Sequence, residues 1–264
     1  MNLLNLRNAC VLALFGCGIA TAAAADSAAE LASRLSAIRQ DGNSSVRMRM
    51  EIRGEPKTNL QLLIKQRRSK GGSEVVYQVL WPKERKGEAV LLRKSANGAI
   101  SGTHFVPPNT TEAIGAGDAS KALLGGDLAY EDVVDNFFAW DQQAIVGTEK
   151  VDGVECQILE SKPGKASSIY GSVKSWVDPK RVVPLRVEKY SSGGKPIRRI
   201  DTLRVVSSDG KQIPANLTVR GPGRSGGTVL DGSKIRHDVS FSDGEFTAEG
   251  LKQAPAGGAA QESE

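Results

Sequence analysis

Cysteine and histidine are scarce in this sequence. Three Cys and two His occur among 264 residues, and neither His104 nor His237 has Cys or carboxylate neighbours at the spacing of metal ligands. A Ser-His-Asp triad would have to use one of these two histidines without any supporting pattern. We therefore expect no catalytic residue, no metal and no cofactor, so that the chain is not an enzyme.

A strong excess of charge of one sign is also missing. The sequence has 35 Lys and Arg against 30 Asp and Glu, a net charge of +5, which is too balanced for a protein that binds nucleic acid through a basic surface alone. Hydrophobic residues make up 39% and charged residues 25% of the chain. These values are ordinary for a globular fold, so disorder throughout is excluded.

The longest apolar run lies at the N-terminus. Residues 1–25 contain one positive charge, an apolar run over 9–20 and four alanines before Asp26, which is typical of a secretory signal peptide. A span of about a dozen residues is too short to cross a bilayer, which takes about 20. We expect cleavage after Ala25, which would leave Cys156 as a single thiol that is buried rather than reactive.

An alternative reading of the same segment remains open. Residues 14–17 resemble a lipobox, and processing there would leave Cys17 as a lipid-anchored N-terminus.

Alternation of apolar and polar residues dominates the chain from residue 45 onward. Val46, Met48 and Met50 alternate with arginines, a period of two that a half-buried strand satisfies. Residues 59–67 and 74–81 repeat this pattern. Further strands are expected at 88–94, 99–106, 143–151, 154–162, 170–177, 184–190, 196–206, 211–219 and 227–241.

Two segments have helical rather than strand periodicity. Ser27 and Glu30 have the spacing of a capping box ahead of an apolar stripe, which predicts a helix that ends before Asp41. Residues 117–138 lack alternation and place apolar pairs at helical intervals, which predicts a central helix. From residue 245 the chain has almost no apolar content, which predicts a disordered tail.

Long antiparallel sheets twist, and their open edges aggregate. We therefore predict a mainly β (α+β) fold in which residues 26–244 form one domain. This domain would be a strongly curved antiparallel half-barrel of about eleven strands, covered by the N-terminal and central helices.

Two motifs stand out within roughly residues 45–240. The more specific is a Gly-Asp-Leu-x-Tyr-Glu-Asp motif, and a Trp-Val-Asp strand is the next. The motif residues are Gly126, Asp127, Leu128, Tyr130, Glu131, Asp132 and Trp176. In order and spacing, these motifs resemble the LolA-like outer-membrane lipoprotein-sorting proteins. One departure is the strand 103–106, where the family usually has a Trp-aromatic pair before two prolines.

This resemblance implies a half-open barrel whose hydrophobic cavity holds acyl chains, often in company with an RND-type transporter. We expect a monomeric periplasmic carrier that passes lipid or lipoprotein acyl chains toward the outer membrane and does not bind nucleic acid. A periplasmic sensor of the same fold that binds a membrane regulator is the alternative.

The apolar residues of the predicted strands and helices have two possible fates, packed core or cavity wall. The cavity candidates are Met48, Met50, Leu62, Ile64, Tyr77, Val79 and Trp81, and the candidates on covering helices are Leu31, Leu35, Leu123, Leu124 and Phe137. The acidic residues of the motif are interpreted as first-turn residues of a helix rather than an acid–base cluster, and Tyr130 is expected to pack the helix on the sheet.

Overall fold

The computed structural model describes residues 27–39, 42–69, 72–95, 98–165, 167–208, 210–222 and 226–253. The predicted signal peptide and the alternative anchor at Cys17 lie outside the described residues. Within this part of the chain, no helix is long and apolar enough to cross a membrane.

The fold is mainly β, as predicted, and consists of one antiparallel sheet of thirteen strands with a few short helices. The strands are β1 (Ser44–Ile52), β2 (Thr58–Ser69), β3 (Gly72–Trp81), β4 (Ala89–Ser95), β5 (Ile100–Val106), β6 (Thr110–Ile114), β7 (Gln142–Val151), β8 (Val154–Lys162), β9 (Ser172–Asp178), β10 (Val183–Tyr190), β11 (Pro196–Ser208), β12 (Lys211–Arg220) and β13 (Thr228–His237).

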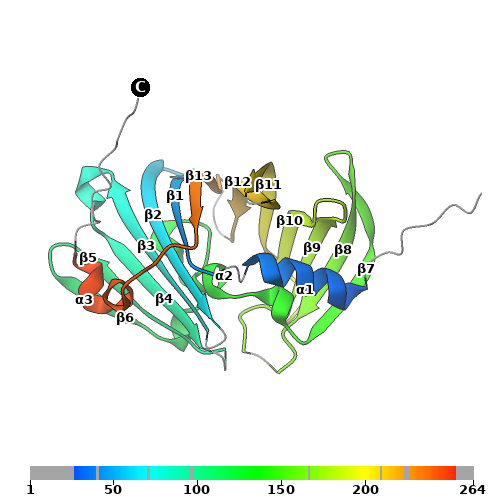
Figure 1. Ribbon diagram of the computed structural model, residues 1–264, viewed down its shortest axis with the longest axis horizontal. Coiled ribbons are helices and arrows are strands. Elements are labelled where there is room, and N and C mark those ends of the chain that lie inside the picture. The colour runs from blue at the N-terminus through cyan, green and yellow to red at the C-terminus, as the bar shows by residue number, and fades with distance from the viewer. Residues whose placement is uncertain are drawn as a thin grey trace, which may run out of the picture.

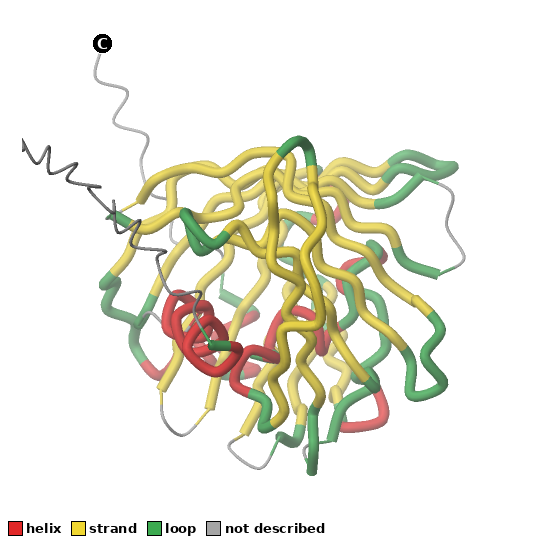
Figure 2. Tube along the Cα trace, turned by 90° about the vertical axis from the view of Figure 1, so that its right-hand side faces the viewer, coloured by secondary structure: helices red, strands yellow, loops and turns green. Residues whose placement is uncertain are grey.

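The strand order shows how the chain builds the sheet. It runs β6-β5-β4-β3-β2-β1-β13-β12-β11-β10-β9-β8-β7, so the first and last strands pair in the middle and the two edge strands follow each other in the chain. The segment 115–141 must therefore cross from one edge to the other. Figure 1 shows the two wings of the sheet, with α2 at the middle between them and α1 in front of the wing that contains β7 to β10. Figure 2 shows strands arching around the helical segments.

The N-terminal helix α1 (Ala28–Arg39) begins as its sequence predicts. The Ser27 N–H donates to Glu30 at 2.9 Å and the Glu30 N–H donates to the Ser27 hydroxyl at 3.3 Å. Leu31 and Leu35 are buried against Phe137 and Phe138. This packing fixes α1 over the wing that contains β7 to β10.

The prediction of one central helix is wrong. The crossing segment, called the insert below, contains four short pieces: η2 (Ala116–Asp118), η3 (Leu123–Gly125), α2 (Tyr130–Val134) and η4 (Phe137–Ala139). Leu124 and Gly125 have positive φ angles of 49° and 86°, which a continuous α-helix cannot accommodate. The apolar pairs are nevertheless buried, because the insert lies against the inner face of the sheet.

Two further predictions need correction. The count of about eleven strands is too low, mainly because β6 is a mostly exposed edge strand without apolar alternation. The disordered tail predicted from residue 245 is wrong for residues 245–251, which form the end of η5 (Asp243–Phe246) and α3 (Ala248–Leu251). Residues 254–264 lie outside the described part.

The segment 241–253, called the C-terminal strap below, packs on the outer face of the sheet. Phe246 and Leu251 are buried against Val76, Leu91 and Phe105 of β3, β4 and β5. Ion pairs from Lys65 to Glu245 at 2.7 Å and from Arg67 to Asp243 at 2.6 Å also hold this segment on the sheet.

Candidate ligand-binding pocket

A pocket of about 380 Å³ lies between the inner face of the sheet and the helical segments below it. Ligand pockets commonly measure roughly 300–1,000 Å³. The strands β1, β2, β3, β10, β11, β12 and β13 line one side, and α1 and the insert line the other. Most of the lining is apolar, so the pocket is suited to a hydrocarbon ligand.

The register of the strands separates the polar and apolar parts of this pocket. Residues directly opposite in an antiparallel pair share a face. Ser44 lies opposite both Gln66 and His237, whereas Met50 lies opposite Leu60 and Leu230. The pocket is therefore polar at the Ser44 end of β1 and apolar at the Met50 end.

The structure separates the predicted cavity residues into two groups. Met48, Met50, Leu62 and Tyr77 line the pocket. Ile64 and Val79 are buried in the adjoining core and do not line it.

Trp81 does not line the pocket either. Leu80 is an extra residue between the pairs Leu62–Val79 and Gln61–Trp81, and such a bulge changes the face of the residues that follow it. Trp81 consequently lies opposite the exposed Gln61 and is 50% exposed.

The predicted covering residues are also divided. Leu35 of α1 and Leu123 of η3 line the pocket. Leu31 and Phe137 pack α1 on the insert, and Leu124 lies in the core. Only part of the apolar surface of α1 and the insert thus faces the pocket.

Several lining residues come from strands that contributed no candidates. Ile200, Leu217 and Leu230 line the pocket from β11, β12 and β13. Their alternation with polar neighbours was visible in the sequence. What the sequence does not contain is which apolar positions of each strand lie over the pocket, because the course of the insert decides that.

Gly126 allows the insert to lie close to the pocket wall. A Cβ atom at this position would stand 2.2 Å from Cε of Met50 and 3.2 Å from Oγ1 of Thr228. Glycine is thus required for this close approach without movement of Met50, a pocket residue.

Asp127 and Leu128 hold the same part of the insert on the sheet. The Asp127 carboxylate accepts from the Thr228 hydroxyl at 2.6 Å and from the Gly221 N–H at 3.2 Å. Leu128 lies in the core and lines the pocket. Tyr130 is buried in this core, as predicted.

Asp132 is the centre of a buried ionic cluster. It accepts from Lys189 Nζ at 2.7 Å, from the Tyr170 hydroxyl at 2.6 Å and from the Ala129 N–H at 2.6 Å, and Arg198 lies 2.8 Å away. The side chains of Asp132, Lys189 and Arg198 are 0%, 3% and 9% exposed. Burial alone would raise the pKa of Asp132, but the two cations hold it below its ordinary value.

Glu131 fixes the insert to a second loop. Its carboxylate accepts from the Ser168 hydroxyl and, at 2.9 Å, from the Ile169 N–H. Burial raises the pKa of Glu131, and these hydrogen bonds oppose the rise only in part. The acidic residues of the motif thus anchor the insert, which supports their interpretation as structural residues.

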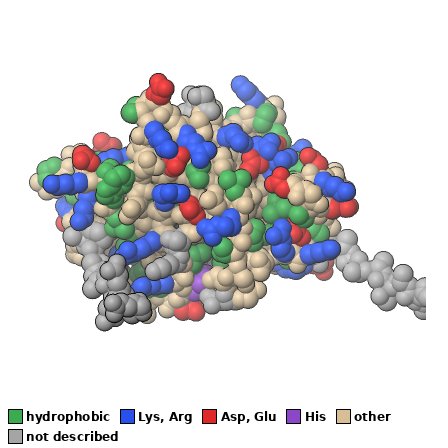
Figure 3. Space-filling model, turned by 90° about the horizontal axis from the view of Figure 1, so that it is seen from above, with side chains coloured by type: hydrophobic (Ala, Val, Ile, Leu, Met, Phe, Trp, Pro, Cys, Tyr) green, Lys and Arg blue, Asp and Glu red, His purple; other side chains and the backbone are tan. Residues whose placement is uncertain are grey.

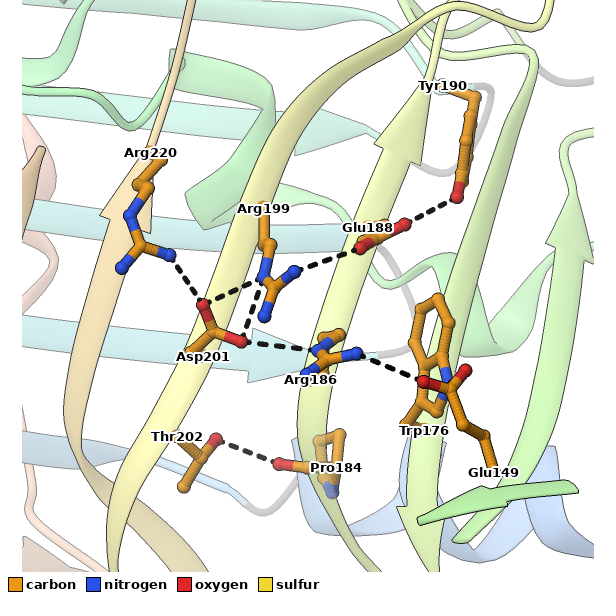
Figure 4. Close-up of polar contacts among 10 residues, drawn as sticks. All are labelled: Glu149, Trp176, Pro184, Arg186, Glu188, Tyr190, Arg199, Asp201, Thr202 and Arg220. Carbon is orange, nitrogen blue, oxygen red and sulfur yellow. Dashed lines mark hydrogen bonds and ion pairs between the residues drawn. The ribbon is translucent and has the colours of Figure 1, made fainter. Parts of the chain in front are cut away.

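Trp176 belongs to a polar network on the outer face, away from the pocket (Figure 4). Its indole N–H donates to Glu149 at 2.8 Å, and the Arg186 guanidinium lies 5.5 Å from its ring centroid. Asp201 pairs with Arg186, Arg199 and Arg220 across β10, β11 and β12. Figure 3 shows the wider pattern of mixed basic and acidic side chains over the face seen from above.

Two further reactive side chains, Cys156 and His104, lie outside the pocket lining. Cys156 is a buried free thiol whose pKa is raised by burial. His104 contacts Glu88 at 3.0 Å. Within the described ranges, no group of three or more His, Cys, Asp or Glu side chains could hold a metal ion.

Comparison with solved structures identifies the class of fold. A protein of the DUF1329 family from Desulfovibrio piger is similar with a TM-score of 0.78 at 21% identity, over 85% of this chain and 97% of that one. A putative outer-membrane lipoprotein-sorting protein domain from Vibrio parahaemolyticus has a TM-score of 0.75 at 21% identity, over 86% and 98%. A LolA-superfamily protein from Nitrosomonas europaea has a TM-score of 0.66 at 21% identity, over 84% and 98%. The protein has the fold of the LolA superfamily, as the motifs predicted.

A family model described as "-like: Uncharacterized protein" matches residues 71–253, so the chain belongs to the family that this model defines. A search of the curated proteins gives no match.

Proposed function

We propose that this protein is a periplasmic carrier of acyl chains. In this proposal the sheet acts as a half-barrel, the pocket holds the acyl chain of a lipid or lipoprotein, and α1 and the insert cover it. The observation that carries the proposal is the apolar pocket between the sheet and these covering elements. The LolA-superfamily fold supports it, because a structural relative is described as a lipoprotein-sorting protein domain.

The energetics explain why such a carrier is needed. Moving one methylene group from water to an apolar site is favourable by about 0.8 kcal/mol of transfer free energy. Exposing a 16-carbon chain to water therefore costs on the order of 10 kcal/mol. A pocket lined by flexible residues such as Met48 and Met50 can follow an acyl chain. The pocket thus lowers the barrier to transfer between membranes.

Native mass spectrometry of the protein released gently from the periplasm tests the proposal. We expect a bound species with the mass of a lipid or lipoprotein, and binding of a fluorescent fatty acid after delipidation. An empty protein that also fails to bind the fatty acid would refute the carrier function.

A pocket-blocking variant makes this test specific. Gly232 lies opposite Met48 on the inner face, and a Cβ there would have only ordinary contacts of 3.5–3.9 Å. In Gly232→Phe the ring would enter the pocket and reduce fatty-acid binding at least tenfold. The matched control is Arg47→Phe, at an exposed position of the neighbouring strand β1, which should bind normally.

The transfer partner belongs to the same proposal. We propose an RND-type inner-membrane transporter as the partner and a monomeric carrier, on the strength of the family resemblance. Crosslinking in intact cells followed by affinity capture tests this. Recovery of such a transporter supports trafficking, whereas recovery of a membrane regulator supports the alternative sensor function.

A further inference from the structure

The outer face of the middle of the sheet is rich in basic side chains. On β1, β11, β12 and β13, residues that alternate with those lining the pocket point away from it. Seven basic and three acidic residues, on these strands or directly after β1, are called the basic face below. They are Arg47, Arg49, Arg53, Lys57, Arg199, Arg204, Arg220, Glu51, Asp201 and Asp231.

Each carboxylate of the basic face is shared by at least two cations. Asp201 lies 2.9 Å from Arg199 and 2.8 Å from Arg220 (Figure 4). Arg186 and Glu188 of β10 contact this margin of the face and add one charge of each sign. Sharing therefore leaves the face with a net positive charge, although its cations have partners. The other shared contacts are Arg49 and Arg204 with Asp231, at 3.7 Å and 2.8 Å, and Arg53 and Lys57 with Glu51, at 2.9 Å and 3.1 Å.

The cations also lie further out than the carboxylates. The side chains of Arg49, Lys57 and Arg220 are 60%, 57% and 58% exposed, whereas those of Glu51 and Asp201 are 16% and 17% exposed. A guanidinium has five N–H donors, and an exposed ion pair occupies only some of them and contributes little to stability. A surface that approaches from outside therefore meets positive charge and hydrogen-bond donors first.

Two exposed apolar side chains flank these cations. Trp81 is 50% exposed and lies opposite Gln61, which lies opposite Arg49 in the next strand. Leu203 is the extra residue of a bulge in β11 and is 63% exposed beside Arg204. Neighbouring strands lie about 4.8 Å apart, so the five steps from β3 to β11 span about 24 Å. Cations together with exposed Trp and Leu suit the head-group region of a lipid layer.

We propose that the basic face docks on the surface of a lipid bilayer that contains anionic lipids. Such a surface attracts clustered Lys and Arg side chains, and this charge complementarity carries the proposal. A bilayer is favoured over a protein partner because the cations are spread over four strands rather than gathered around one site, and lipid head groups can move to meet them. The proposal goes beyond the carrier function, since the basic face and the pocket lie on opposite sides of the sheet.

Vesicle co-sedimentation tests this docking. The mature protein is mixed with vesicles of phosphatidylcholine alone, or of phosphatidylcholine and phosphatidylglycerol in equal amounts. We expect at least tenfold tighter binding to the anionic vesicles. Raising the salt from about 0.1 M to about 1 M shortens the Debye length from about 10 Å to about 3 Å and should remove most of this preference.

A double variant locates the binding surface. Arg49→Gln combined with Arg220→Gln should bind anionic vesicles at least tenfold more weakly. Asp231 and Asp201 each keep another cation in this variant, so it should fold normally.

The matched control removes two exposed cations elsewhere. Lys121 of the insert and Lys162 of β8 are 64% and 49% exposed. Lys121→Gln combined with Lys162→Gln should weaken vesicle binding less than threefold.

Two single variants test the charge and the apolar side chains separately. Asp231→Asn removes a shared carboxylate and should bind anionic vesicles at least threefold more tightly. Leu203→Ser should bind at least threefold more weakly with an unchanged salt dependence. Circular dichroism confirms that each variant is folded.

The outcomes separate docking from the carrier function. Equal binding to both kinds of vesicle would overturn the proposal and leave an acidic protein as the candidate partner of the basic face. An equal loss in the double variant and its control would also overturn it. Gly232→Phe, which blocks the pocket, should bind vesicles as the wild type does, and a loss there would place the lipid contact at the pocket instead. Fatty-acid binding by the double variant should be unchanged, so the carrier function stands or falls independently.

Discussion

Lys189 shows how the inner face of the sheet tolerates a buried charge. Its Nζ contacts Asp132 at 2.7 Å and lies 4.8 Å and 5.1 Å from the ring centroids of Tyr170 and Phe137. A cation is stabilised by a carboxylate and by the faces of aromatic rings. These contacts allow a lysine to point inward from β10 on the same face as Val187.

Removing this charge should destabilise the protein strongly. Lys189→Met keeps the length of the side chain but leaves the buried Asp132 with one cation, and breaking a buried pair costs about 3–5 kcal/mol. Chemical denaturation should show a loss of this size. Lys174→Met changes the outward-facing residue of the neighbouring strand, over the ring of Tyr190, and should cost no more than about 1 kcal/mol. For Lys189→Met, a loss as small as that of the control would contradict the role of the cluster.

The carboxylate of Glu88 should make the free energy of unfolding depend on pH. Burial by itself would raise its pKa, but hydrogen bonds from His104 and Arg85 lower the pKa to about 2 from an ordinary value of 4.5. A carboxyl whose pKa is lower in the folded state contributes stability above its unfolded pKa and loses it as the pH falls. The contribution of Glu88 should be complete above about pH 5 and disappear between about pH 4.5 and pH 2.

The measurement is the free energy of unfolding of the wild type and of Glu88→Gln at several pH values. The variant should be less stable by a few kcal/mol near neutral pH, and the difference should shrink as the solution is acidified. A difference that does not change with pH would exclude this role for Glu88.

At the scale of elements, the C-terminal strap should contribute stability without contributing to binding. Lys65 pairs with Glu245 at 2.7 Å, and Phe246 is buried on the outer face, opposite the pocket. Truncation of a buried phenylalanine costs about 3–5 kcal/mol. Phe246→Ala should lower the free energy of unfolding by this amount and leave the affinity for a fluorescent fatty acid unchanged within twofold.

Denaturant titration and ligand titration of the same preparation check this pair of expectations. A variant with normal stability would show that the strap is not part of the folded domain. A large loss of affinity in a folded variant would show that the two faces of the sheet are coupled.

The sequence predicts elements where one physical signal dominates. The alternation of Val46, Met48 and Met50 with arginines requires a strand, and the capping box of Ser27 requires a helix start. The strap and the insert were mispredicted because their structure depends on distant surfaces. Phe246 packs on an apolar patch of β3 to β5. The insert, in which Leu124 has a positive φ, is held on the sheet by Asp127 and Asp132.

The residues that line the pocket are likewise predictable only in part. Periodicity places Met48 and Leu62 on the inner face, but it also places Val79 and Trp81 there. The bulge at Leu80 and the path of the insert decide which of these residues face the pocket. Both are consequences of pairing between distant parts of the chain, and no local pattern contains them.

At the scale of the whole molecule, ligand binding should slow hydrogen exchange in the middle of the sheet and not at its edges. Among the described residues, the lining comes mainly from the central strands, from α1 and from the insert, and β6 and β7 do not contribute to it. Hydrogen exchange reports local opening of such elements. We expect a bound fatty acid to slow exchange in β1, β13 and α1, and to leave β6, β7 and the C-terminal strap unchanged.

Gly232→Phe serves as the control for this measurement. Because its pocket is blocked, addition of fatty acid should change exchange nowhere in the variant. Protection confined to an edge strand of the wild type would place the ligand outside the pocket.

The path of the insert from one margin of the sheet to the other has a mechanical consequence. The insert links the two edge strands and is bonded midway through Asp127, Glu131 and Asp132. Moving the two wings of the sheet apart would therefore require these contacts to break. The helix α1 precedes β1 in the chain. It contacts the insert through apolar packing and through a hydrogen bond that Asn136 donates to Ser36. We therefore expect α1, rather than the insert, to move when a ligand enters the pocket.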